Sequence, residues 1–182
     1  MTYRALVVAG IAGCTAAARP TADATVGSGS FAINGTAQNI QAVWATIGYE
    51  FIGNGNDSVG SFQLAFAATG AGVMCSETSA LAVVEQISIL TTQVFSPTSG
   101  GSPSLAPGAI PVVTAGSISV SVPPAHPVAY IERVHPEPSA GTVTITSADA
   151  TTLQGTFDAT GASISGSISV TGSFAATICP AE

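Results

Sequence analysis

Apolar and polar residues alternate along much of the chain, most clearly near its C-terminal end. Between residues 164 and 178 every second position is apolar or glycine, and serine and threonine fill most positions between them. Because successive side chains of a strand point to opposite faces, this segment predicts a half-buried antiparallel strand, or a bent pair of strands with a β-bulge at Gly172. The apolar face comprises Ile164, Gly166, Ile168, Val170, Gly172, Phe174, Ala176 and Ile178. We expect one buried group and two water-facing serines: Val143, Phe157, Ile168 and Phe174 inside, and Ser167 and Ser169 outside.

The same pattern predicts a hairpin near the start of the chain. Phe31-Ala-Ile33 is followed by Asn34-Gly35, two residues that tolerate the positive φ of a tight hairpin turn. The strand after the turn is expected to carry Trp44 into the core. Its predicted face is Ile40, Ala42, Trp44 and Thr46, and further alternating segments are 118–122, 143–145 and 153–157.

A short motif of glycine, a hydroxyl residue and phenylalanine recurs at irregular intervals. The irregular spacing argues against a solenoid with a fixed repeat. We interpret each copy as a strand that enters the core through one aromatic ring, beside a glycine that permits close packing. The copies are Gly29–Phe31, Gly60–Phe62, Gly155–Phe157 and Gly172–Phe174.

Three further segments complete the pattern. Residues 79–95 suit a strand, although their first part also suits a short helix, and residues 97–111 predict a loop rich in Pro, Gly and Ser. Prolines bracket a strand at Val128–Val134, which places them at its ends or on a sheet edge. Eight or more short strands separated by turn signals predict an all-β fold, an antiparallel β-sandwich or a partly closed barrel with little helix.

Charged residues are scarce, and this excludes several classes of partner. They make up 7% of the 182 residues, with three Lys and Arg together and a formal net charge of −7. A chain with so few cations cannot neutralise a phosphate backbone, so nucleic acid is not expected as a partner. Docking to anionic lipid through a basic patch is excluded for the same reason. The length suits one domain with a sizeable core.

The first residues carry a targeting signal. Arg4 precedes an apolar run at 5–12, too short to span a bilayer but suited to the core of a signal peptide. The run ends in Ile-Ala-Gly-Cys14, which resembles the lipobox of bacterial lipoproteins. This resemblance implies a signal peptide at 1–13 and a lipid on the Cys14 thiol. Ordinary secretion with cleavage near Ala16–Ala18, or a plain N-terminal strand of a cytosolic protein, are the alternatives.

The segment after Cys14 is small and polar. It predicts a flexible tether at 14–24 followed by a single domain at 25–182. From residue 141 onward the chain resembles the C-terminal part of small bacterial lipoproteins. That resemblance implies an envelope location and a sandwich, and no activity.

The two remaining cysteines suit an exported protein. Cys75 and Cys179 are expected to form a disulfide, a bond that persists in oxidising compartments. Two buried free thiols are the alternative. The chain contains no C-x-x-C spacing, so neither a zinc ribbon nor a thioredoxin-like site is supported.

Metal sites have only weak support. His126 and His135 lie at the two ends of the strand at 128–134 and could share a metal with nearby glutamates, but we favour exposed loop histidines. The loop before Val59 matches part of a calcium-binding nonapeptide, with Asp57 as its carboxylate, but we favour a plain β-turn, which explains it without calcium. No metal and no cofactor is therefore predicted.

We expect an exported, lipid-anchored cell-envelope protein that acts as a non-enzymatic binding or structural module. Its anchor would lie in a membrane, at the outer membrane or facing the periplasm or cell surface, with another envelope protein or a second copy as partner. A self-associating surface or fibre subunit is the alternative, because sheet edges without Lys lack a usual protection against edge pairing.

An extracellular hydrolase is a third hypothesis. It would need two carboxylates facing each other across a cleft. No Gly-x-Ser-x-Gly elbow or Lys-containing phosphate loop is present. The carboxylates considered are Glu50, Asp57, Glu77, Glu85, Glu132, Asp149 and Asp158.

Overall fold

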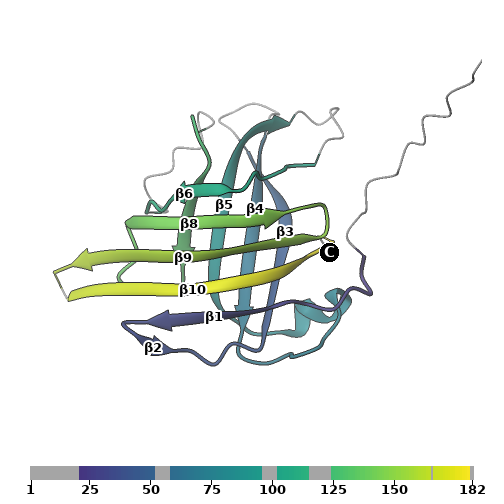
Figure 1. Ribbon diagram of the computed structural model, residues 1–182, viewed down its shortest axis with the longest axis horizontal. Coiled ribbons are helices and arrows are strands. Elements are labelled where there is room, and N and C mark those ends of the chain that lie inside the picture. Colours follow the sequence, from purple (N-terminus) through teal and green to yellow (C-terminus); the bar gives the residue numbers. More distant parts are fainter. Residues whose placement is uncertain (1–20, 52–57, 96–101, 115–123, 165, 181–182) are drawn as a thin grey trace, which may run out of the picture.

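The computed structural model describes residues 21–51, 58–95, 102–114, 124–164 and 166–180 (Figure 1). This part of the chain forms a 10-stranded sheet and a short 3-10 helix, η1. The elements are β1 (Ser28–Ile33), β2 (Thr36–Ala37), β3 (Ala42–Phe51), β4 (Ser58–Ala67), η1 (Cys75–Ala80), β5 (Val83–Phe95), β6 (Gly108–Pro111), β7 (Val128–Glu132), β8 (Ala140–Ala148), β9 (Thr152–Ser163) and β10 (Gly166–Cys179).

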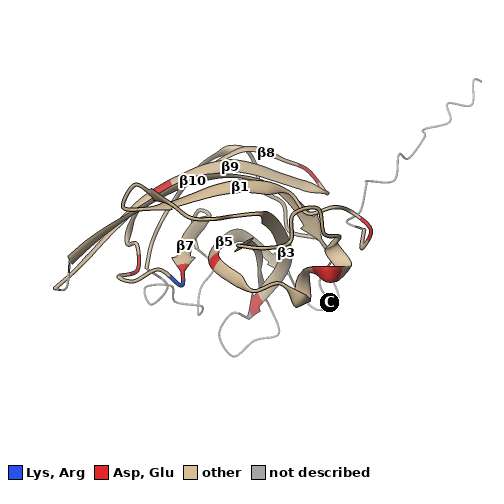
Figure 2. Cartoon of the chain, turned by 90° about the horizontal axis from the view of Figure 1, so that it is seen from below, with Lys and Arg blue, Asp and Glu red and all other residues tan. Residues whose placement is uncertain are grey.

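The sheet is folded over into two layers. Its strand order is β6-β8-β9-β10-β3-β4-β5-β7, with β1 paired to β10 and β2 to β1. In Figure 1 β8, β9, β10 and β1 run across the view, whereas β3, β4 and β5 run up and down behind them. Figure 2 shows β1, β8, β9 and β10 as a curved roof over β3, β5 and β7. We call these the upper and lower layers.

Strand β10 joins the two layers. One of its edges pairs with β9, antiparallel, from Gly166 to Thr177. The other edge pairs first with β1, antiparallel, and then with β3, parallel, over its last residues Thr177–Cys179. Among the strand pairs of the described residues this one is parallel and the others are antiparallel.

The outermost strands of the sheet also meet. Just after β6, Val112 forms a parallel bridge to Ala129 of β7, and the Val113 amide donates to the Ala129 carbonyl at 2.8 Å. The Val112 amide donates in turn to Gly141 of β8, so one short segment ties the upper layer to the lower layer. The predicted all-β fold with little helix is confirmed, with sandwich-like layers that approach a closed barrel.

The main core lies between the layers, and the alternation places its side chains. Val143, Phe157, Ile168 and Phe174 are all buried in one cluster, as predicted. Ser167 is exposed. Ser169 is half-buried, because its backbone pairs with Asn34, whose side-chain oxygen accepts the Ser169 amide at 2.8 Å.

Two details of the predicted C-terminal strand are wrong. Ile164 does not lie on the apolar face, because it falls in the turn between β9 and β10 and is fully exposed. Gly172 is not at a bulge, since the pairing of β10 with β9 runs through it without a register shift. An apolar residue next to a tight turn extends the alternating pattern without belonging to the strand.

The recurring glycine–phenylalanine motifs interlock across three strands. In register, Phe174 of β10 lies between Gly29 of β1 and Gly155 of β9, and Gly172 lies between Phe31 and Phe157. A Cβ on Gly155 would stand 2.6 Å from the Phe174 ring, and a Cβ on Gly172 would stand 2.4 Å from the Phe157 ring. The Phe174 and Phe157 rings therefore each cover a cross-strand glycine, which supports the interpretation of these glycines as packing residues.

Most of the other predicted elements are also observed. The predicted turn at Asn34 and Gly35 is present, with φ of 49° and 76°. The strand after it is the short β2 and not the predicted one, because β3 begins only at Ala42; Ile40 lies before β3 and packs against the main core, apart from Ala42 and Trp44. Residues 79–95 form strand β5 after the end of η1, and the predicted loop at 97–111 contains β6 at its end. The predicted strand at 118–122 lies outside the described residues.

Candidate functional site

A second apolar cluster covers the outer face of the lower layer, on β3 and β4. Since β3 alternates, Val43 and Ala45 face the main core, whereas Trp44 faces outward into this second cluster. Trp44 is buried as predicted, with 6% of its surface exposed, but on the opposite side of β3 from the main core. The cluster comprises Val26, Ala42, Trp44, Ala65, Ala67, Cys75 and Cys179.

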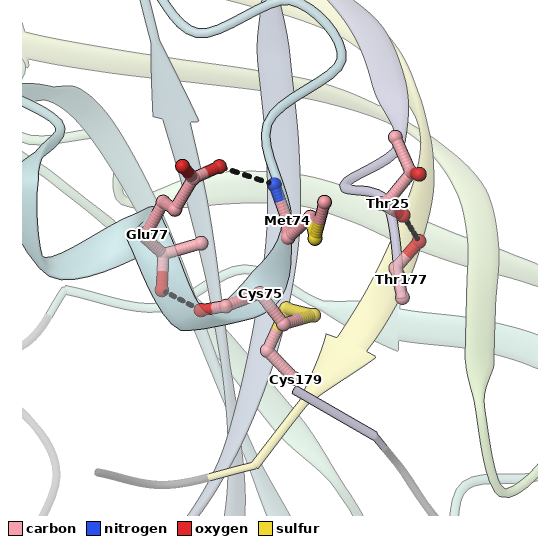
Figure 3. The surroundings of a disulfide bond; sticks show 7 residues. Thr25, Met74, Cys75, Glu77, Thr177 and Cys179 are labelled. Carbon is pink, nitrogen blue, oxygen red and sulfur yellow. Dashed lines mark hydrogen bonds between the residues drawn. A yellow bond between two sulfur atoms is a disulfide. The ribbon is translucent and has the colours of Figure 1, made fainter. Parts of the chain in front are cut away.

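A disulfide between Cys75 and Cys179 lies inside this cluster (Figure 3). Their Cα atoms are 5.3 Å apart, and both residues are buried. The bond links η1 to the end of β10, so it fastens the segment that covers Trp44 to the strand that joins the layers. The pairing is the one expected from the sequence.

Hydrogen bonds attach the N-terminal segment to the same place. The Cys75 amide donates to the Ala24 carbonyl at 2.8 Å, and the Ser76 amide donates to the Ala22 carbonyl at 3.0 Å. The Thr177 hydroxyl donates to the Thr25 carbonyl at 2.7 Å (Figure 3). The part of the predicted tether that the structure describes therefore packs against η1.

A shallow groove of about 420 Å³ runs over β3 beside this cluster. Its floor includes Trp44, Thr46, Gly48 and Gln63, which share the outer face of β3 and β4. One side is formed by residues 78–83, and Pro180 and Ile47 also line it. We call this hollow the outer groove. Among the described residues its lining carries aromatic, hydroxyl and amide groups and no charged side chain.

Polar side chains continue from the outer groove across the lower layer. Gln63 pairs with Thr46 on one side and Ser88 on the other, and Ser88 pairs with Tyr130. These four residues therefore form one row across β3, β4, β5 and β7, on one face of the layer. The next row holds Trp44, Ala65, Gln86 and Glu132. We call the two rows together the polar strip.

The polar strip contains a hydrogen-bonded network at its β7 end. The Ser88 hydroxyl donates to the Glu132 carboxylate at 3.1 Å, and the Gln86 amide donates to the Ser88 oxygen at 3.4 Å. Burial raises the pKa of Tyr130, a hydrogen bond with Ser88 opposes the rise, and the carboxylates of Glu132 and Glu50 add to it. The tyrosine therefore keeps its proton and remains a donor at neutral pH.

Two polar groups on this face have no partner among the described residues. The Gln63 amide is half-buried and makes no hydrogen bond with another described side chain or backbone group. Ser61 Oγ is buried, with 1% of the residue exposed, and is likewise unpaired. Ser61 lies opposite Gly48, which lines the outer groove, and a Cβ on Gly48 would stand 2.8 Å from Ser61 Oγ. Unpaired buried hydroxyls are rare enough to need an explanation.

One carboxylate points into the main core. Glu85 shares the inner face of β5 with Ile87 and pairs with Phe66, and it is 8% exposed. Burial raises the pKa of Glu85 to about 7, and the charge of Arg133 partly offsets the rise. Arg133 itself donates to the Val83 carbonyl at 3.0 Å. Glu85 Oε2 has no hydrogen-bond partner among the described residues.

The residues considered for metal binding do not form a site in the described part of the chain. His126 and His135 are exposed near opposite ends of β7, and His126 Nδ1 lies 3.3 Å from the neighbouring Pro127 oxygen. Among described residues no group of three or more His, Cys, Asp or Glu side chains is placed to hold a metal ion. Asp57 and Cys14 lie outside the described residues.

The sequence alone did not point to the polar strip. Gln63, Ser88 and Tyr130 come from three strands, and only the pairing register brings them into one row. Outward polar residues on alternating strands are the usual solvated face, so no local signal separates these from others. Once the fold is known, this face is distinguished by the burial of Ser88 and by the presence of Trp44 and Tyr130 near the ends of the rows.

No helix in the described part of the chain has the length and apolar character needed to cross a membrane. Comparison of the chain with protein-family models, with curated proteins and with solved structures gave no match in any of the three.

Proposed function

We propose that this chain is an exported, lipid-anchored protein of the cell envelope that acts as a non-enzymatic binding module. The observation that supports export most directly is the buried Cys75–Cys179 disulfide. Such bonds persist outside the cytosol and are rare within it. The apolar run at 5–12 and the lipobox-like string that ends at Cys14 support the anchor, because several acyl chains on a mature lipoprotein hold it in a membrane without a basic patch.

The outer groove supports the binding role. It is a concave surface with a few polar groups around an aromatic residue, which is the usual composition of a small-ligand site. No carboxylate lines it, so the groove lacks the facing acid pair that the hydrolase hypothesis requires. A binding module is therefore the first choice, and the hydrolase is the less favoured hypothesis.

Intact mass of the protein purified from membranes tests the anchor. We expect a chain that begins at Cys14, carries a lipid adduct, and is lighter by two hydrogens for the disulfide. Cys14→Ser should release the protein from membranes or leave an uncleaved precursor. A variant that fractionates and migrates like the parent contradicts the anchor, and native Cys75 and Cys179 that react with a thiol probe without reductant contradict export.

A self-associating surface subunit is the second candidate, favoured by the hairpin of β9 and β10. Ile164 is fully exposed at its tip, and the strands there carry mainly serine, glycine and alanine. Sedimentation at rising protein concentration separates this candidate from a monomeric module. Growth of the particle that Ile164→Ser abolishes would favour self-association, and a constant monomer would count against it.

A further inference from the structure

We propose that the outer groove and the polar strip form one binding site for a neutral oligosaccharide. This inference rests on the proposed function as a binding module, and it names the class of ligand. The site is built from the outer face of β3, β4, β5 and β7, with the groove at the β3 end and Tyr130 at the β7 end.

The length of the site indicates an oligomer. Neighbouring strands lie about 4.8 Å apart, so the row from Thr46 through Gln63 and Ser88 to Tyr130 spans roughly 14 Å. This distance exceeds one sugar ring and suits a short chain of linked rings. The row is continuous, because each member is the direct cross-strand partner of the next.

The hydrogen-bonding groups match a ligand made of hydroxyls. The Gln63 amide has both donors and an acceptor available among the described residues, and Thr46 and Tyr130 each add a hydroxyl. Glu132 already accepts from Ser88 and keeps further acceptor capacity for donors. Ser61 Oγ lies buried and unpaired next to Gly48, a lining residue of the groove whose added Cβ would stand 2.8 Å from that oxygen. A ligand hydroxyl or a bridging water above Gly48 would supply its missing partner.

The charges near the site select against an anionic ligand. Arg133 is the only described cation, and its side chain is held by the Val83 carbonyl and faces Glu85. Two carboxylates, Glu132 in the strip and Glu50 near it, would repel a phosphate, sulfate or carboxylate group. Figure 2 likewise shows acidic segments spread over the ribbon and a single blue segment next to β7.

Aromatic groups occupy both ends of the site. Trp44, which is 6% exposed, contributes a small accessible surface to the outer groove, and Tyr130 is half-buried at the other end. Tyr130 therefore offers apolar surface next to polar groups, which suits the CH-rich faces of a sugar ring, whereas Trp44 borders the groove.

Trp44 is the single tryptophan of the chain, so its fluorescence reports directly on the groove. The full-length protein, in a detergent without a sugar headgroup, is titrated with maltohexaose, xylohexaose and chitohexaose up to about 5 mM. A sulfated hexasaccharide and hexalysine serve as charged comparators. We expect at least one neutral hexasaccharide to change the fluorescence saturably and to bind more tightly than either comparator.

Three variants locate the binding. Gln63→Ala should weaken it about tenfold or more, and Tyr130→Phe, which removes only the hydroxyl, should weaken it severalfold. Thr156→Ala removes an exposed hydroxyl from the upper layer and should leave it unchanged. Circular dichroism of each variant confirms folding before titration.

Three results would overturn the inference. The first is no fluorescence response to any neutral hexasaccharide. The second is that Gln63→Ala and Tyr130→Phe bind as tightly as the parent, and the third is tighter binding of a charged comparator. The titration does not depend on the state of Cys14. If the anchor and disulfide tests succeed and the titration fails, the ligand class is wrong. If the titration succeeds and the anchor test fails, the error lies in the proposed location.

Discussion

Removing the Cys75–Cys179 bond should destabilise the protein by an amount that its loop length sets. The two cysteines are separated by 104 positions in the sequence. Closing a loop of this length lowers the entropy of the unfolded chain by the equivalent of about 4.7 kcal/mol in the chain-entropy model. Single domains are stable by only about 5–15 kcal/mol, so this bond accounts for a large share of the total. We therefore expect Cys75→Ala/Cys179→Ala to lose about 3–5 kcal/mol.

Urea unfolding followed by Trp44 fluorescence measures the loss, because Trp44 packs in the same cluster as both cysteines. The oxidised parent, the parent with reductant, and the double variant are compared at one pH. The reduced parent should match the double variant, and reductant should have no effect on the double variant. A double variant within about 1 kcal/mol of the oxidised parent would refute the argument, because a long loop would then have been closed without benefit.

Three further outcomes follow from the packing and the titrating groups. Phe174→Ala should lower the free energy of unfolding in urea by about 3–5 kcal/mol, because it empties a core site and uncovers Gly155. Ser173→Ala on the outer face should lower it by less than about 1 kcal/mol. Equal losses would mean that the face assignment is wrong. The pKa of Glu85 rises from 4.5 to about 7 in the folded protein, so the free energy of unfolding should fall as pH rises between these values, by at most about 1.4 kcal/mol per pH unit. Glu85→Gln should flatten that slope, and an unchanged slope would point to another group. Hydrogen bonds from the Thr151 and Thr152 backbone and side chains lower the pKa of Asp149 to about 2. Asp149→Ala should therefore be less stable than the parent at pH 6 and equally stable once pH falls below 2. A stability difference that persists in acid would contradict this.

Much of the strand content could be read from the sequence because alternation is a local property. The faces of β9 and β10, the Asn34-Gly35 turn and the burial of Phe157 and Phe174 all follow from the period of two. Local pattern also misled, since Ile164 extends the alternation into a turn and Gly172 suggests a bulge that the pairing of β10 with β9 lacks.

The sequence could not predict which strands would become neighbours. The parallel pairing of β10 with β3 joins residues far apart in the chain, and no local feature of Thr177 or Trp44 announces it. The polar strip depends instead on three registers at once, those of β3 with β4, β4 with β5 and β5 with β7. The alternation of β3 predicts that Trp44 is buried, but it does not indicate which face of β3 is covered at that residue.

The central place of β10 also has a consequence for the order of events during biosynthesis. It is made after the nine other described strands, yet it supplies the partner for β9, for β1 and for residues 44–46 of β3. Until it emerges, no described strand pairs with both the hairpin of β8 and β9 and the meander of β3, β4 and β5, and Cys75 lacks its disulfide partner Cys179. Contacts of such long sequence separation form slowly even when the whole chain is present. The topology therefore keeps the nascent polypeptide from completing its fold early, which is the condition under which a chain can be threaded through a translocation pore.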